Sequence, residues 1–226
     1  MSKFQYTINF DDTNNKTFEI NVDEKTFIIK DDDNVAAPEW TLLANNKCTH
    51  CPYNTDKVKY CPVAKNLSQA ADTFGDKKSF TEVTVFVKTE NRMYGKKTDL
   101  QTALFSLFGL LMATSNCPHL HIFKPMARFH LPFSTTEETT VRSLGMHLIH
   151  EYLLFQENQN HKISLDNLSK KYEAVADVNR GIIQRIRSLK GGGDASKNAV
   201  IVLDNFASLL PLEISSGLSE IKNMFD

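Results

Sequence analysis

Apolar and polar residues alternate along several short stretches near the start of the chain. The alternation runs through residues 4–10, 17–22 and 79–89. A period of two is typical of a β-strand with one buried face. A shorter apolar run at 26–30 predicts one more strand, which would join the first two in an antiparallel meander.

Beyond residue 98 the apolar residues recur every three or four positions, which predicts helices. The expected helices cover 99–114, 136–156, 164–189, 195–210 and 212–225, with Pro211 ending the fourth. A short helix is expected behind Cys61, with Pro62 in its first turn. The helix at 99–114 is apolar nearly all round, which predicts burial, and a capping box at 135–138 begins the next one. On that next helix we expect His147 and His150 to face the solvent.

The order of these elements predicts the fold class. Strands come first and helices second, which is typical of an α+β protein. We expect an N-terminal antiparallel β meander with a Cys-rich loop segment at 38–66, followed by a mainly α-helical half. A β-rich region at 1–90 and a helical region at 91–226 would be its two parts, either as separate domains or as one continuous domain.

Composition narrows the class of protein without selecting a reaction. The chain has 226 residues and a formal net charge of -1, which argues against a nucleic-acid binder with a basic surface. Its most apolar stretch, 102–113, is shorter than the roughly 20 residues that span a bilayer. The first residues lack the apolar core of a secretory signal. We therefore expect a cytoplasmic protein without a membrane partner.

Four cysteines are the compositional feature that suggests chemistry. Cys48 and Cys51 form a C-x-x-C pair, Cys61 follows it, and Cys117 lies far downstream. Because cytoplasmic thiols stay reduced, disulfides are not expected. A C-x-x-C turn directs two thiolates at one ion, and two further cysteines would complete a tetrahedral metal site. The alternatives are small buried hydrophobes and redox-active thiols.

Three histidines near the cysteines bear on the choice of metal. His50, His119 and His121 are alternate ligands, and a mixture of imidazole and thiolate favours zinc over an iron–sulfur cluster. Four thiolates without histidine would favour the cluster instead. A redox C-x-x-C is expected at a helix N-terminus behind a strand, whereas polar residues 45–47 precede this one.

A second candidate site lies in an aromatic, proline-rich stretch. Arg128 and His130 are two residues apart, so both side chains would face one side and form a small anion pocket with Lys124 and His121. In an enzyme, Arg128 would bind the anionic group and His130 would be the general base. Alternatively, Arg128 ties down backbone carbonyls and His130 is a structural histidine.

Three segments together resemble an uncharacterised bacterial protein family of unknown function, over roughly residues 38–210. They read CTHCPYN…YCPVAKNL, KTDLQTALFSLFGLLMATSNCPHL and KPMARFHLPFSTTEET. The resemblance implies that the four cysteines and the block at 125–130 belong together, and it implies no reaction. The Cys-Pro dipeptides also resemble the end of ferredoxin-type cluster motifs and the dipeptide of haem-responsive regulators, although prolines also punctuate ordinary loops.

The sequence therefore predicts a cytoplasmic protein that is not a conventional enzyme. We expect the four cysteines to hold a metal, zinc first and an iron–sulfur cluster second, and to lock a loop-rich segment against the helical core. The role would be regulatory, through an unidentified protein partner, and the stripe of the helix at 164–189 would also suit a homodimer. The alternative is a metal- or thiol-dependent enzyme that acts on a small anionic substrate. The familiar nucleotide-binding glycine motifs are absent from the sequence.

Overall fold

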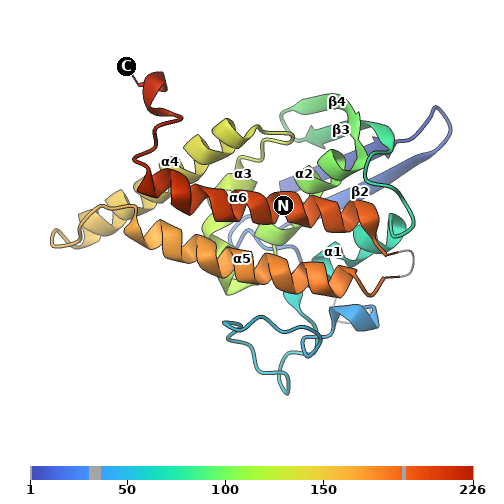
Figure 1. Cartoon of the computed structure of the whole chain (residues 1–226), viewed down its shortest axis with the longest axis horizontal. Helices are drawn as coiled ribbons and strands as arrows, with labels where there is room; N and C mark the ends of the chain where they lie inside the picture. Colours follow the sequence, from blue (N-terminus) through green and yellow to red (C-terminus); the bar gives the residue numbers. More distant parts are fainter. Residues whose placement is uncertain (1, 31–36, 190–191, 226) are drawn as a thin grey trace.

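The computed structural model describes residues 2–30, 37–189 and 192–225. Its strands and helices follow one another in α+β order (Figure 1). They are β1 (Ser2–Asn9), β2 (Asn15–Val22), the 3₁₀ helix η1 (Glu39–Thr41), α1 (Pro62–Thr73), β3 (Glu82–Thr89), β4 (Met93–Asp99), α2 (Leu100–Ala113), the 3₁₀ helix η2 (Pro118–Phe123), α3 (Lys124–Arg128), α4 (Thr136–Glu157), α5 (Asp166–Ile186), α6 (Asp194–Ser215) and the 3₁₀ helix η3 (Lys222–Met224). The predicted α+β class is confirmed.

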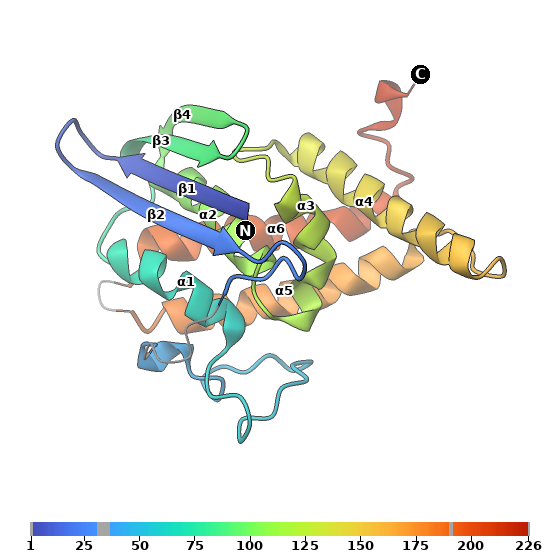
Figure 2. The same ribbon diagram turned by 180° about the vertical axis from the view of Figure 1, so that it is seen from behind.

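The four strands form one antiparallel sheet in the order β2-β1-β3-β4. Figure 2 shows this sheet lying over α2, with the helices on one side of it. Alternate residues of β1, β2 and β3 form its buried face, and they are Phe4, Tyr6, Ile8, Phe18, Ile20, Val22, Val83, Val85 and Val87. The period-two prediction is therefore confirmed for these three strands.

Residues 26–30 do not form the expected third strand of a meander. The Asp23 carboxylate accepts hydrogen bonds from backbone N–H groups of the turn behind it, and Phe27 has a φ of 54°. This turn leaves a single bridge, between Ile29 and Val22. The free edge of β1 pairs with β3 instead.

Strand β4 has no period-two pattern that would predict it. It is held by backbone pairing with β3, in which Gly95 lies opposite Phe86. A Cβ at Gly95 would approach the Phe86 ring to 3.2 Å, so glycine leaves room for that ring. Lys96 and Lys97 keep this edge of the sheet charged, which discourages pairing with other chains. The sheet thus extends beyond residue 90.

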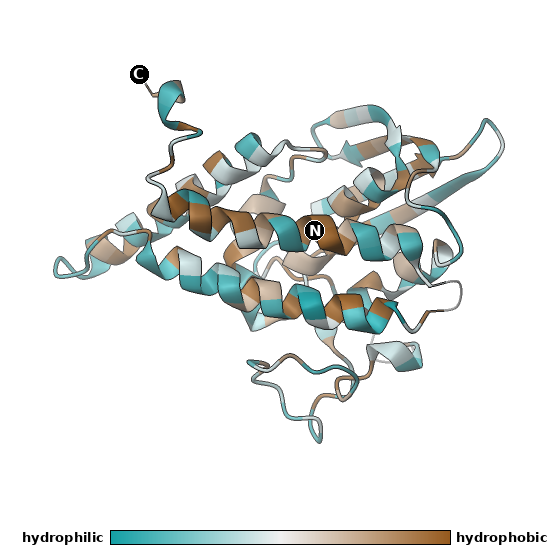
Figure 3. Ribbon diagram, viewed as in Figure 1, coloured by the Kyte–Doolittle hydropathy of each residue, from teal (hydrophilic) through white to brown (hydrophobic). Residues whose placement is uncertain are grey.

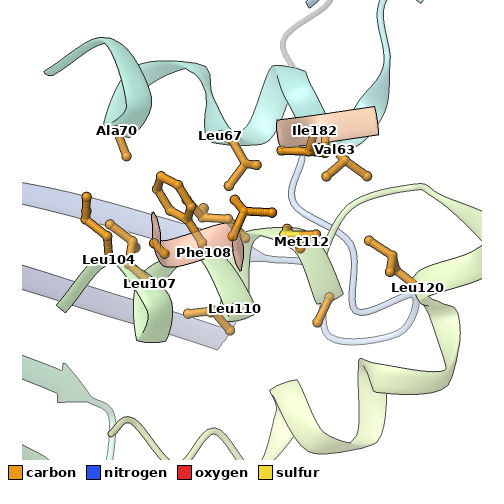
Figure 4. Packing of buried hydrophobic residues seen from close by; sticks show 14 of the residues in the cluster. Val63, Leu67, Ala70, Leu104, Leu107, Phe108, Leu110, Met112, Leu120 and Ile182 are labelled. Atoms are coloured by element: carbon orange, nitrogen blue, oxygen red, sulfur yellow. The ribbon is translucent and has the colours of Figure 1, made fainter. Parts of the chain in front are cut away.

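Helix α2 lies at the centre, between the sheet and the pair formed by α5 and α6 (Figures 1 and 2). It begins after Asp99, whose carboxylate accepts the Thr102 N–H at 2.8 Å as an N-cap. Buried side chains lie all round the helix, which confirms its predicted burial. Figure 4 shows Phe108 of α2 in the same apolar cluster as Leu67 of α1 and Ile182 of α5.

Helix α4 begins at the predicted capping box. The Thr135 hydroxyl accepts the Glu138 N–H at 3.1 Å, and the Glu138 carboxylate accepts the Thr135 N–H at 2.8 Å. Each contact satisfies a backbone N–H that the helix itself leaves unpaired.

The expectation that His147 faces the solvent is wrong, while His150 is exposed as expected. The His147 side chain is 4% exposed and lies 3.7 Å from the equally buried Glu151 carboxylate. Glu151 also lies 2.9 Å from His161. A buried carboxylate needs charged or hydrogen-bonding partners, and the imidazoles of His147 and His161 are the partners of Glu151.

Helices α5 and α6 lie side by side and antiparallel (Figure 1). The predicted stripe of α5 is buried in the core of the chain itself: Leu168, Tyr172, Val175, Val178, Ile182 and Ile186. Pro211 does not end α6, because its φ suits a helix and the buried Leu210 holds this turn against the core. Of the expected last helix, residues 212–215 belong to α6 and only η3 follows.

Helix α6 is the more apolar of the pair, as Figure 3 shows. By length and composition it would be able to cross a membrane. Its buried side chains pack against α2 and α5, and 22% of its most apolar window is buried within the chain.

Candidate metal centre

The four cysteines lie in three segments that meet beside α5. Cys48 and Cys51 belong to the loop between η1 and α1, Cys61 is the N-cap of α1, and Cys117 is the N-cap of η2. Figure 1 shows the loop below α5. The charges of the three other thiols all act on Cys48, which places the four sulfur atoms in one neighbourhood.

Helix α5 holds the C-x-x-C turn at two positions one helical turn apart. The Asp177 carboxylate accepts hydrogen bonds from the Thr49 hydroxyl at 2.9 Å and from His50 Nδ1 at 3.3 Å. At Gly181, an added Cβ would lie 3.1 Å from the Cys48 sulfur. A larger residue there would push the thiol away from the helix.

Arg185 anchors the beginning of the same loop. Its buried guanidinium donates hydrogen bonds to the carbonyl oxygens of Trp40, Leu42 and Leu43, at 3.2, 2.5 and 3.2 Å. Burial lowers the pKa of Arg185, and the nearby charges of Cys61, Cys48 and Cys51 oppose that change. A permanent cation therefore lies next to the thiols, where it would offset part of the charge of a thiolate centre.

Two contacts join the C-x-x-C loop to the segment around Cys117. The Tyr53 hydroxyl donates a hydrogen bond to the carbonyl oxygen of Asn116. His119 Nε2 lies 2.8 Å from the carbonyl oxygen of His50, to which it donates. The loop is thus attached on one side to α5 and on the other to η2.

Burial and mutual repulsion hold the thiols of Cys48 and Cys117 in their protonated form. The pKa of Cys48 is raised to about 12, first by burial and then by the charges of Cys61 and Asp177. The pKa of Cys117 is also raised to about 12, again chiefly by burial, although the His119 N–H stabilises its thiolate. These two thiols ionise more readily when a metal supplies positive charge, so metal binding would release protons.

The histidines have other contacts in this arrangement. His50 faces Asp177, and His119 bonds to a backbone carbonyl. His121 Nε2 is buried without a hydrogen-bond partner in the described part of the chain, and burial followed by the charge of Lys124 lowers its pKa. Among the described residues, no three His, Cys, Asp or Glu side chains converge closely enough to hold a single metal ion.

Arg128 and His130 contact different parts of the chain. Arg128 donates to the carbonyl oxygen of Glu24, and its guanidinium lies 5.0 Å from the centre of the Phe27 ring. His130 Nε2 lies 2.5 Å from the Tyr6 hydroxyl, and burial lowers the pKa of His130 to about 3. An imidazole with so low a pKa is a weak general base at neutral pH.

Three residues that position the cysteines escaped the sequence analysis. Asp177, Gly181 and Arg185 recur every four residues on α5, so they share one face of that helix. Their spacing is a signal in the sequence: an acidic residue, a glycine and an arginine interrupt an otherwise apolar pattern at a helical period. The apolar stripe beside these three residues dominates the pattern and predicts the helix without them.

Comparison with known proteins places the chain in a family. No curated protein and no solved structure matches it. A family described as a domain of unknown function, DUF6901, matches residues 4–226. The match covers nearly the whole chain and confirms the resemblance to a family of unknown function. The chain therefore belongs to the DUF6901 family.

Proposed function

We propose that Cys48, Cys51, Cys61 and Cys117 ligate a [4Fe–4S] cluster that locks the loop at 42–60 onto α5. The observation that carries this proposal is the gathering of four thiols from three segments in one place. Cysteine thiolates are the usual ligands of such clusters. The contacts of His50 and His119 elsewhere leave the thiols as the ligand set.

The spacing of the thiols favours a cluster over a single zinc ion. With Zn–S bonds of about 2.3 Å, tetrahedral thiolates would stand about 3.8 Å apart. In a four-iron cluster each thiolate binds a different iron, so the ligand sulfurs stand further apart. The charges of the other three thiols contribute to the raised pKa of Cys48, yet among the described residues no three His, Cys, Asp or Glu side chains converge on one ion. A cluster, whose thiolates need not meet at a single ion, is therefore the group we propose.

The surroundings also suit an anionic cluster. Arg185 supplies a buried positive charge beside Cys61, Cys48 and Cys51. The backbone N–H groups of His119 and Leu120 form hydrogen bonds that favour the Cys117 thiolate. Charge compensation and N–H···S bonds are the protein contributions that stabilise iron–sulfur clusters and tune their potentials.

The proposed role is regulatory rather than catalytic. In the fully described stretch from 44 to 60, every residue is at least partly exposed. Its attachment therefore depends on a few hydrogen bonds and on whatever joins the four thiols. Loss of the cluster would release this loop from α5 and η2. A partner protein would then distinguish the cluster-loaded form from the cluster-free form by the position of the loop.

Metal analysis of protein purified without oxygen tests the ligand set. We expect about four iron and four sulfide per chain, with visible absorption that bleaches on reduction. Cys61→Ser should lose this absorption, whereas the matched variant His119→Gln should retain it. A result of one zinc per chain without iron would mean that the four cysteines form a zinc site instead of a cluster. Less than about a tenth of an equivalent of either metal would overturn a metal centre altogether.

Limited proteolysis tests the regulatory step. Cleavage within 44–60 should be slow in cluster-loaded protein and fast after removal of the cluster, because cleavage follows the population of the open loop. Equal cleavage rates in the two forms, with their iron contents confirmed, would show that the cluster does not hold the loop in place. That result would contradict the proposed role.

A further inference from the structure

A largely apolar cavity of about 130 Å³ lies between α2, α5, α6 and the segment from η2 to the first turns of α4. Its walls include Phe105, Gly109, Met112, Phe123, Val175 and Phe206. Its volume is close to the roughly 150 Å³ of an engineered apolar cavity that binds benzene. None of the four cysteines lines it.

Asn179 is a buried polar group in the wall of this cavity. It is 1% exposed, and its amide lies beside the Asp204 carboxyl of α6, where a hydrogen bond to Asn179 favours the carboxylate. Neither amide atom makes a well-formed hydrogen bond within the described chain, so the amide has capacity left for another polar atom.

Arg142 is the cationic side chain of the lining. Its Nη2 donates to the carbonyl oxygens of Met126 and Phe129, both at 2.9 Å, which holds the guanidinium in place. Neither bond uses Nε or Nη1, so one of these N–H groups can donate a charge-assisted hydrogen bond to an anionic oxygen.

We propose that the cavity binds a small monocarboxylic acid whose apolar body is no larger than a benzene ring. The carboxylate pairs with Arg142 and the body contacts the aromatic and aliphatic walls. The amide of Asn179 in the cavity wall contacts a neutral polar atom of the ligand. This binding is independent of the proposed cluster.

Calorimetric titration with benzoate, and with toluene as the uncharged probe, tests the proposal on the full chain. Benzoate should bind at least tenfold more tightly than toluene, and Arg142→Gln should remove that preference. Arg128→Gln is the matched control, since Arg128 is an exposed arginine outside the cavity and its loss should leave benzoate affinity unchanged.

A second variant locates the site. A Cβ at Gly109 makes only ordinary contact, 3.8 Å from Leu203, so Gly109→Ala should fold normally and Gly109→Leu should fill the cavity. Benzoate binding should survive Gly109→Ala and be lost in Gly109→Leu, with both melting temperatures recorded. The proposal is overturned if wild type binds no benzoate at millimolar concentration, if toluene binds equally well, or if folded Gly109→Leu still binds benzoate.

Discussion

Replacing His130 should change how the stability of this protein depends on pH. The imidazole lies 2.5 Å from the Tyr6 hydroxyl, which itself lies 2.9 Å from the Ser106 hydroxyl, and Phe4 packs edge-on at 5.9 Å. Burial, followed by the charge of Arg142, lowers the pKa of His130 from 6.5 to about 3. The side chain is therefore neutral in the fold and protonated in the unfolded chain between these two values.

The size of the effect follows from proton linkage. Between pH 6.5 and 3 the unfolded chain binds one more proton than the fold, so the free energy of unfolding falls as the pH falls, by about 1.36 kcal/mol per pH unit. Between pH 7 and 5, His130 alone should therefore remove about 1.9 kcal/mol, and the loss should level off near pH 3.

Urea denaturation of wild type and His130→Gln at pH 7, 6 and 5, followed by circular dichroism, measures this term. Glutamine keeps a polar partner for Tyr6 but does not titrate, and the other histidines contribute equally to both proteins. The stability advantage of wild type should shrink by about 1.9 kcal/mol from pH 7 to 5. Parallel pH profiles would refute the reasoning, because they would show that His130 titrates alike in both states.

Three further substitutions test other contacts. Arg185→Met should lower the free energy of unfolding in urea by at least about 3 kcal/mol, because three carbonyl oxygens lose a charged donor. The control Arg187→Met replaces an exposed arginine and should change it by no more than about 0.5 kcal/mol. Equal effects of the two substitutions would contradict the anchoring role. Thr135→Ala should cost about 1 kcal/mol by removing the capping box, and no change in melting would contradict it. Gly181→Ala should lower iron content after reconstitution by crowding the neighbouring thiol, whereas Gly145→Ala, where an added Cβ meets nothing within 4 Å, should not.

The parts of the fold that the sequence predicts are those in which one face of an element is buried. β1, β2 and β3 alternate because their inner residues fill the core and their outer residues meet solvent. β4 has no such contrast, since it is an edge strand joined mainly through its backbone. Pro211 misleads for a similar reason, because packing of the neighbouring turn outweighs one lost hydrogen bond.

The candidate sites differ in how much of each could be predicted from the sequence. The cysteines were identified from their spacing, and whether they bind metal stays a prediction. Their anchors on α5 depend on tertiary contacts over more than a hundred residues of chain, as in the bond from Arg185 to Trp40. The cavity has no local pattern at all, since its walls come from five α-helices, the 3₁₀ helix η2 and a loop.

That cavity has a consequence for the response of the protein to pressure. A void of about 130 Å³ in each molecule amounts to about 80 mL/mol. Where its lining is apolar this space excludes water, and unfolding eliminates that dry part, so compression favours the unfolded state. Volume changes of unfolding commonly reach about -20 to -100 mL/mol, so the dry part of this space would contribute a measurable share of the total. A compound that fills the space would protect the protein against pressure more than its affinity alone would suggest.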